Sequence, residues 1–276
     1  MNKIYFGING QFGDIVIQEP TLRHIVESNP DKKIVLGCYK KYKEILDLYE
    51  DYHPNVVERK IWDGYNDWPT LEDSKYIKSQ NFEHIYNPMP KHKEKDWALK
   101  RHQVAELADM YDLKIDDIQI RLKMPKDVKP KKKTVSISLF ASDWVYNGIK
   151  SVDMFSVVNV VKYLHKLGYK IIHLNGPNEP DIPLATKVNK SYLDSVKAML
   201  ETDFLITVDT GMSWVASAYQ HPVIGLYSWG YNPVSGTSKN WQPINPNATY
   251  LESRTAKDIS PKQIVEAIHD KIRELK

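Results

Sequence analysis

Residues 205–227 constrain the fold of this chain more than any other stretch. They contain an apolar run that ends at Asp209, a tight turn at Thr210 and Gly211, a short helical segment that is broken at Pro222, and a second apolar run. This order predicts a strand–turn–helix–strand unit of a parallel α/β sheet. In such sheets ligands bind at the carboxyl ends of the strands, where a helix N-terminus offers N–H groups to a phosphate. We therefore expect an anion or nucleotide site at Asp209, Thr210 and Gly211.

The same alternation of strand and helix runs through both halves of the 276-residue chain. Alternation of this kind is typical of parallel sheets built from right-handed β–α–β units, so we expect two Rossmann-like domains facing each other across a cleft. Residues 62–79 are aromatic and polar without a clear period and are predicted to be irregular. The predicted strands are 3–8, 33–36, 56–57, 82–86, 135–140, 170–174, 204–208 and 223–226, and the predicted helices are 15–27, 39–49, 96–111, 152–166, 192–200 and 261–275.

A lysine-rich segment, residues 125–133, is the best candidate for a domain boundary. Its two prolines and five lysines exclude a buried strand or helix. We therefore expect an N-terminal domain at 1–125, a linker at 126–133 and a C-terminal domain at 134–276. The lysines are interpreted first as a solvated linker and second as a phosphate-binding patch, because short charge runs are usually exposed. A formal net charge of +3 does not demand a nucleic-acid partner.

Composition also excludes several classes of protein. The single cysteine, Cys38, excludes an internal disulfide and a cysteine-based zinc site. No apolar run approaches the ~18 residues of a spanning helix, and the first residues lack a signal-peptide pattern. The expectation is a cytoplasmic protein that touches the inner membrane face at most peripherally.

A glycine-rich turn follows the first predicted strand. Its spacing from Gly7 to Gly13 is G-x-x-G-x-x-G, not the G-x-G-x-x-G of dinucleotide-binding proteins, and no acidic residue ends the second predicted strand. This disfavours a nicotinamide-dependent enzyme. The turn presents Asp14 at the start of a helix, where two interpretations remain open. Asp14 is either a plain helix cap or a general base in the cleft, where partial desolvation raises a carboxyl pKa.

Two motifs resemble those of glycosyltransferase family 9, the heptosyltransferases. GDIVIQEPTL at 13–22 is similar to the family's G-D-hydrophobic…P-A-L opening. VDTGMSW at 208–214, running on to PVIGLY at 222–227, is similar to its N-D-[ST]-G-x-x-H…P-V-[IV]-A-L-F-G block. The motifs occur in the family's order and span nearly the whole chain. The resemblance implies a GT-B fold and an inverting transfer of a sugar from a nucleotide-diphosphate donor, often ADP-heptose, without an essential metal.

The resemblance also implies roles for individual residues. Asp14 corresponds to the general base for the acceptor hydroxyl, and Gly13, which precedes it in the opening motif, is expected to contact the nucleotide sugar. Lys150 corresponds to a lysine that contacts the diphosphate. Glu179 corresponds to a glutamate that holds the nucleoside. The remaining matches are contacts to the diphosphate and donor sugar, and they fall on Asp209, Thr210 and Gly211. No cofactor and no metal ion are expected beyond the nucleotide-sugar co-substrate, and no Asp-x-Asp pair occurs in the chain.

Two departures from the family pattern concern this site. Trp214 stands where the family usually has histidine, and Ser228-Trp-Gly replaces a glycine-proline-threonine turn. Four tryptophans fall in the loops and turns of the predicted second domain, as local packing residues or as a stacking platform for a base or sugar. They are Trp144, Trp214, Trp229 and Trp241.

The expected partners are a nucleotide-diphosphate sugar and a glycan or lipid-linked acceptor. Two alternatives to sugar transfer onto a glycan stay open. One is a regulatory module that binds a nucleotide sugar without transferring it, and the main reason to consider it is Trp214 in place of the family's usual histidine. The other is transfer to a nucleic-acid base reached through the lysine-rich segment, a less favoured acceptor that salt-dependent DNA binding would reveal.

Overall fold

The chain divides into two compact units, Met1–Met124 and Pro125–Lys276. The computed structural model describes residues 3–8, 10–49, 56–62, 71–86, 101–141, 148–174, 176, 179–188, 191–230 and 236–276. The first unit contains β1 (Lys3–Gly7), α1 (Phe12–Ile17), α2 (Glu19–Ser28), β2 (Lys33–Tyr39), α3 (Lys43–Leu46), β3 (Val56–Trp62), α4 (Leu71–Ser79), β4 (Phe82–Tyr86) and α5 (Gln103–Asp109). The second contains β5 (Thr134–Ser138), α6 (Met154–Lys166), β6 (Lys170–Leu174), β7 (Ala185–Val188), α7 (Tyr192–Leu200), β8 (Phe204–Val208), α8 (Gly211–Ala218), β9 (Val223–Ser228), β10 (Ala248–Ser253) and α9 (Pro261–Glu274).

A parallel four-stranded sheet forms the centre of the first unit, with strand order β3-β2-β1-β4. The chain passes from β1 to β2 and β3 on one side and then returns to β4 on the other side of β1. The strand order therefore reverses between β1 and β4, and the carboxyl end of β1 leads into the glycine-rich turn and α1. Such a reversal is where open α/β sheets bind ligands.

The prediction of one continuous helix over 15–27 is wrong. The structure has two helices, α1 and α2, which are separated at Gln18. Pro20 lies in the first turn of α2, where its missing N–H costs nothing, but it cannot extend α1 because it lacks the donor and its ring clashes with the preceding turn. Gln18 donates from Nε2 to the carbonyl oxygen of Asp14 at 2.8 Å. The break thus fixes the end of the short helix that carries Asp14.

Other boundaries of the first unit also differ from the predictions. β3 runs to Trp62 and is longer than predicted, because the polar residues of this edge strand interrupt its apolar pattern. The helix α4 occupies part of the stretch predicted to be irregular. The predicted helix over 39–49 begins after a strand that extends to Tyr39, and only a 3₁₀ turn and α3 are helical. The helix predicted over 96–111 is α5, which starts after His102, whose side chain accepts from Val104 N–H; residues 96–100 lie outside the described residues.

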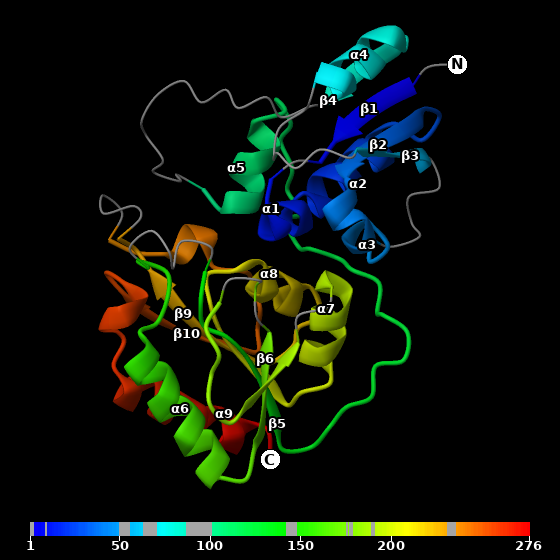
Figure 1. Cartoon of the computed structure of the whole chain (residues 1–276). Coiled ribbons are helices and arrows are strands. Elements are labelled where there is room, and N and C mark those ends of the chain that lie inside the picture. The colour runs from blue at the N-terminus through cyan, green and yellow to red at the C-terminus, as the bar shows by residue number, and fades with distance from the viewer. Residues whose placement is uncertain are drawn as a thin grey trace. The chain divides into compact units, whose positions relative to one another are not determined.

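The second unit is built on a parallel six-stranded sheet with the order β10-β9-β8-β5-β6-β7. Figure 1 shows α6 beside α9 on one side of this sheet and α7 with α8 on the other. An apolar core between the sheet and α6 and α9 contains Val135, Ile137, Phe204 and Ile206. The two strands that the sequence did not predict, β7 and β10, are the edges of the sheet, and their half-exposed side chains form no apolar run. The α/β fold class with two parallel sheets is confirmed.

The lysine-rich segment is tied to the second unit. Lys131 donates its backbone N–H to the carbonyl oxygen of Glu201 at 2.7 Å, and the two side chains form an ion pair. Glu201 is the residue that ends α7. This part of the predicted linker is therefore attached to α7.

A buried ionic cluster joins α2 to the segment before the second unit. Glu19 is fully buried and accepts from Arg23 Nε at 3.3 Å and from the backbone N–H of Arg121 at 2.9 Å. Arg23 also donates to Asp117 at 2.5 Å and to the carbonyl oxygen of Gln119 at 2.6 Å. Burial raises the pKa of Glu19 to about 7, although the Arg121 N–H and the Arg23 guanidinium favour its charged form.

This cluster predicts a stability that falls as the pH rises toward neutrality. The folded pKa of Glu19 lies above its ordinary value of 4.5, so its contribution to stability is complete below pH 4.5 and is lost as the pH rises through 7. At ~1.4 kcal/mol for each pKa unit, the loss amounts to about 3 kcal/mol. Urea unfolding between pH 5 and 8 measures it. We expect the free energy of unfolding to fall less steeply with pH in Glu19→Gln than in Glu27→Gln, an exposed control on the same helix. Equal slopes in the two variants would contradict the raised pKa of Glu19.

Candidate active site

The strand order of the six-stranded parallel sheet reverses between β5 and β8. These neighbouring strands pair from Val135–Phe204 to Ser138–Thr207, but β5 leads toward β6 and β8 leads toward β9 on the opposite side. The loops that follow them therefore diverge, and this geometry opens a crevice for ligands in open α/β sheets. The predicted residues Lys150 and Asp209 follow these two strands in the chain.

Lys150 and Asp209 form an ion pair across this point. The distance from Lys150 Nζ to Asp209 Oδ2 is 2.6 Å, and the side chains are 27% and 12% exposed. The ammonium group is thus held at the edge of the sheet while remaining partly accessible to an anion. A carboxylate with one cation partner can exchange that partner for solvent when a more highly charged ligand arrives, because the pair is not fully desolvated.

The N-terminus of α8 lies directly after Asp209. Thr210 is the N-cap residue with an extended backbone, and Gly211 begins the helix, so no side chain shields its first N–H group. The first N–H groups of a helix have no intrahelical acceptor, and the helix dipole adds positive potential there. Thr210 Oγ1 lies 3.1 Å from Thr207 Oγ1, which fixes the cap against β8. This arrangement suits a phosphate.

A buried tyrosine is hydrogen-bonded to this turn through Ser213. Ser213 donates its hydroxyl to the carbonyl oxygen of Thr210 at 2.6 Å, and Tyr227 donates to Ser213 Oγ at 2.8 Å. Burial, followed by the nearby charge of Asp209, raises the pKa of Tyr227 well above its usual value, so Tyr227 stays a neutral donor. Sequence reasoning missed both residues. Their signal was the hydroxyl at the third helical position and the polar atom in an otherwise apolar strand.

Glu179 lies after β6, the strand next to β5. Its Oε2 is 3.2 Å from Nε2 of His173, and its backbone N–H donates to the carbonyl oxygen of Gly176 at 3.3 Å. A side chain at Gly176 would place its Cβ 3.0 Å from Glu179 Oε1, so the glycine gives the carboxylate room. The structure therefore brings Glu179 to the same edge of the sheet as Lys150 and Asp209.

Asp14 lies in the first turn of α1 in the first unit, one residue after Gly13. Its Oδ2 accepts the backbone N–H of Gln11 at 2.9 Å, which is the capping geometry expected of an acid at this position. Gly10 has φ +109°, and a Cβ there would approach Asp14 Cβ to 2.5 Å, so only glycine fits. The capping role is present, and the role as a general base stays a prediction.

The tryptophans do not form an exposed stacking surface at Trp214 and Trp241. These two side chains are 3% and 7% exposed, so their rings pack inside the second unit. Trp214 is the fourth residue of α8, and its indole completes the buried face of that helix. Its role as a donor contact stays a prediction. Trp229 is partly exposed, and Trp144 lies outside the described residues.

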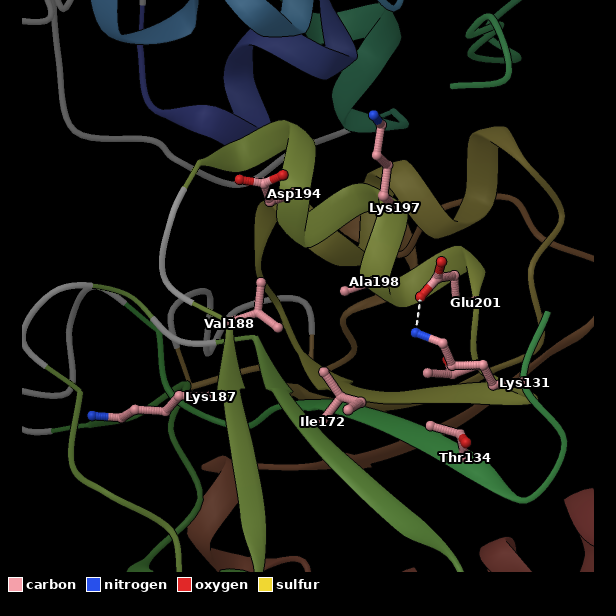
Figure 2. Close-up of a pocket in the computed structure, with 10 residues that line it drawn as sticks. Lys131, Thr134, Ile172, Lys187, Val188, Asp194, Lys197, Ala198 and Glu201 are labelled. Atoms are coloured by element: carbon pink, nitrogen blue, oxygen red, sulfur yellow. Dashed lines mark hydrogen bonds and ion pairs between the residues drawn. The ribbon is translucent and has the colours of Figure 1, made fainter. Parts of the chain in front are cut away.

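A separate hollow of ≈ 380 Å³ lies between α7 and strands β5, β6 and β7. None of the predicted site residues lines it. Figure 2 shows that Lys187 and Lys197 point away from it, while Lys131 is engaged by Glu201. Its charged groups do not converge on one point, so it is not the predicted anion site.

Known proteins were compared with this chain by sequence and by fold. Residues 175–269 match the model of glycosyltransferase family 9 (heptosyltransferase). The matched residues all lie in the second unit. The match contains Glu179, Asp209, Thr210, Gly211 and Trp214. Asp14 and Lys150 lie outside it. No curated protein sequence matches the chain.

Solved heptosyltransferase structures share the fold along the whole chain. The E. coli ADP-heptose LPS heptosyltransferase II has a TM-score of 0.71 at 13% identity, with 99% of each chain covered. A family 9 glycosyltransferase of Veillonella parvula has a TM-score of 0.69 at 16% identity, covering 99% of this chain and 98% of that one. The E. coli heptosyltransferase WaaC, solved with ADP-2-deoxy-2-fluoro heptose, has a TM-score of 0.62 at 12% identity, covering 97% of this chain and 99% of that one. The fold is thus that of GT-B heptosyltransferases.

The resemblance to the family 9 glycosyltransferases is confirmed, and these findings support glycosyltransferase activity. Among the described residues, no group of three or more histidine, cysteine, aspartate or glutamate side chains is placed to hold a metal ion. The helices that the structure describes include none long and apolar enough to cross a membrane.

Proposed function

We propose that the protein transfers a sugar from a nucleotide-diphosphate donor, of the ADP-heptose kind, to a hydroxyl group of a glycan or lipid-linked acceptor. The observation that carries this proposal is the ion pair of Lys150 with Asp209 beside the N-terminus of α8. A partly exposed ammonium group beside the positive end of a helix suits the negative charge of a diphosphate. The heptosyltransferase structures with the same fold, including one named for ADP-heptose and one holding its fluorinated analogue, favour this donor class.

The proposed reaction is a direct displacement with inversion. Asp14 accepts the proton of the acceptor hydroxyl as its oxygen attacks the anomeric carbon, and the bond from that carbon to the diphosphate oxygen breaks. Lys150 and the first N–H groups of α8 stabilise the charge that develops on the leaving diphosphate. This charge stabilisation comes from the protein's own groups, so the proposed mechanism needs no metal ion.

A donor screen tests the substrate class. Binding to the native state stabilises it by mass action, by about 2.7 kcal/mol at a ligand concentration 100 times Kd. We expect an ADP-linked sugar to raise the melting temperature more than UDP-, GDP- or CDP-linked sugars at equal concentration. A larger shift with another nucleotide would keep the reaction class and replace the donor. No shift with any of them would contradict the proposal.

A second candidate, a nucleotide-sugar-binding module without transfer, is favoured by one observation. Trp214 occupies the position of the family histidine and is buried, and an indole cannot carry the positive charge that a protonated histidine supplies. Release of nucleoside diphosphate in the presence of donor and a panel of glycan acceptors separates the two functions. A transferase releases it only when an acceptor is present, whereas a binding module releases none.

A further inference from the structure

His173 is a fully buried histidine in the apolar core of the second unit. It lies on β6, between Ile137 of β5 and Lys187 of β7, and its exposed fraction is 0%. The ring of Phe140 meets it edge-on at 6.2 Å between ring centroids. Its side chain points to the same face of the sheet as Ile171, which belongs to the core under α6 and α9.

The two ring nitrogens of His173 have different environments. Nε2 lies 3.2 Å from Glu179 Oε2, and Nδ1 is buried without a hydrogen-bond partner among the described residues. A buried polar atom without a partner is destabilising, and an aliphatic side chain would fill the same place without that penalty. Packing alone therefore does not account for a histidine here. The contact that distinguishes it from an aliphatic residue is the one to Glu179.

His173 holds the carboxylate of Glu179 at the sheet edge, and Gly176 leaves room for it. His173 engages Oε2, and Oε1 lies over Gly176, where a Cβ would come to 3.0 Å. The carboxylate is 12% exposed, so it is oriented before any ligand arrives and yet remains reachable. A carboxylate fixed in this way can accept hydrogen bonds from a pair of neighbouring hydroxyl groups.

We infer that His173 is a positioning residue, which donates from Nε2 to Glu179 and fixes the carboxylate for the hydroxyl groups of the donor's nucleoside ribose. The inference rests on the proposed function, because it assigns Glu179 to the donor. It adds a buried layer to the site: His173 touches no substrate and acts only through Glu179. Outer-layer partners that orient a binding group are worth about a tenfold change in affinity when one directed hydrogen bond is lost.

The test compares two diphosphate ligands, of which only one carries a nucleoside. Calorimetry measures the Kd of inorganic pyrophosphate and of whichever nucleoside diphosphate, among ADP, UDP, GDP and CDP, the wild-type chain binds most tightly. We expect His173→Leu to weaken the nucleoside diphosphate about tenfold and to leave pyrophosphate unchanged. His173→Gln, which keeps a donor, recovers most of the loss. Ile171→Val, a purely apolar change on the same face of β6, is the control and leaves both Kd values unchanged.

A double-mutant cycle separates positioning from folding. If His173 acts through Glu179, His173→Leu has no further effect in a Glu179→Ala background. Equal weakening of both ligands, unchanged binding of the nucleoside diphosphate, or additive effects in the cycle would overturn the inference. Where His173→Leu does not fold, His173→Phe beside Phe140 takes its place. A wild-type chain that binds no nucleoside diphosphate refutes the proposed function, and the inference falls with it; unaltered binding in the variant refutes the inference alone.

Discussion

Replacing Asp14 by asparagine is expected to lower kcat by about 10²–10⁴-fold while leaving the Kd of the donor unchanged. Asparagine cannot take the proton of the acceptor hydroxyl, so the step that forms the new glycosidic bond loses its base. Its side-chain oxygen can still accept the N–H of Gln11, an interaction that Asp14 makes at 2.9 Å. The turn and the start of α1 should therefore survive the change, which separates the catalytic role from the capping role.

The measurement is the steady-state release of nucleoside diphosphate with saturating donor and acceptor, together with the Kd of the donor alone. Asp31→Asn is a matched control, because Asp31 is an exposed aspartate of the same unit. We expect it to keep full turnover. Full turnover of Asp14→Asn would leave Asp14 as a helix cap and remove it from the mechanism.

Replacing Lys150 by methionine is expected to have the second large effect, in both binding and turnover. The ammonium lies 2.6 Å from Asp209, which directly precedes the N-cap of α8. Removing a preorganised group that stabilises a developing negative charge costs about 10²–10³-fold in kcat. Methionine keeps the length of the aliphatic chain, so the loss reports on charge and hydrogen bonding.

The variant also leaves Asp209 without this cation, and an unpaired carboxylate repels a diphosphate. The double variant Lys150→Met with Asp209→Asn removes that repulsion. We expect it to remain defective, because the cation is still missing. Lys162→Met, an exposed lysine on α6, serves as the control. Recovery of the double variant to wild-type rates would show that Lys150 only neutralises Asp209.

The sequence predicts the central strands of both sheets well, and the physical reason is their burial. All five residues of β5 and of β8 are buried. β8 appears in the sequence as an apolar run and β5 as β-branched residues alternating with small hydroxyl residues, whereas the half-exposed edge strands β7 and β10 show no apolar run. The break between α1 and α2 could have been predicted from Pro20. The apolar period continues on both sides of the proline, so the period alone predicts one helix.

The candidate site was predictable where chemistry and topology coincide. Asp209 ends a buried strand and Gly211 starts a helix, and together they placed an anion site at a sheet edge. The pairing of Lys150 with Asp209 was not predictable, because it depends on which two strands are neighbours. The contact of His173 with Glu179 was not predictable either, because no residue spacing indicates it.

The central claim is that the carboxyl edge of the second unit binds a nucleoside diphosphate at Lys150 and the N-terminus of α8. Calorimetric titration of ADP, the nucleotide of the donor proposed here, into the wild-type chain and into Lys150→Met tests it most directly. We predict a saturable isotherm with one site per chain, and a Kd at least ~10-fold higher in the variant, the loss expected when a charge-assisted hydrogen bond worth about 1.5–3 kcal/mol is removed. An equal Kd in the two proteins, or no binding of any nucleoside diphosphate to the wild-type chain, would contradict it.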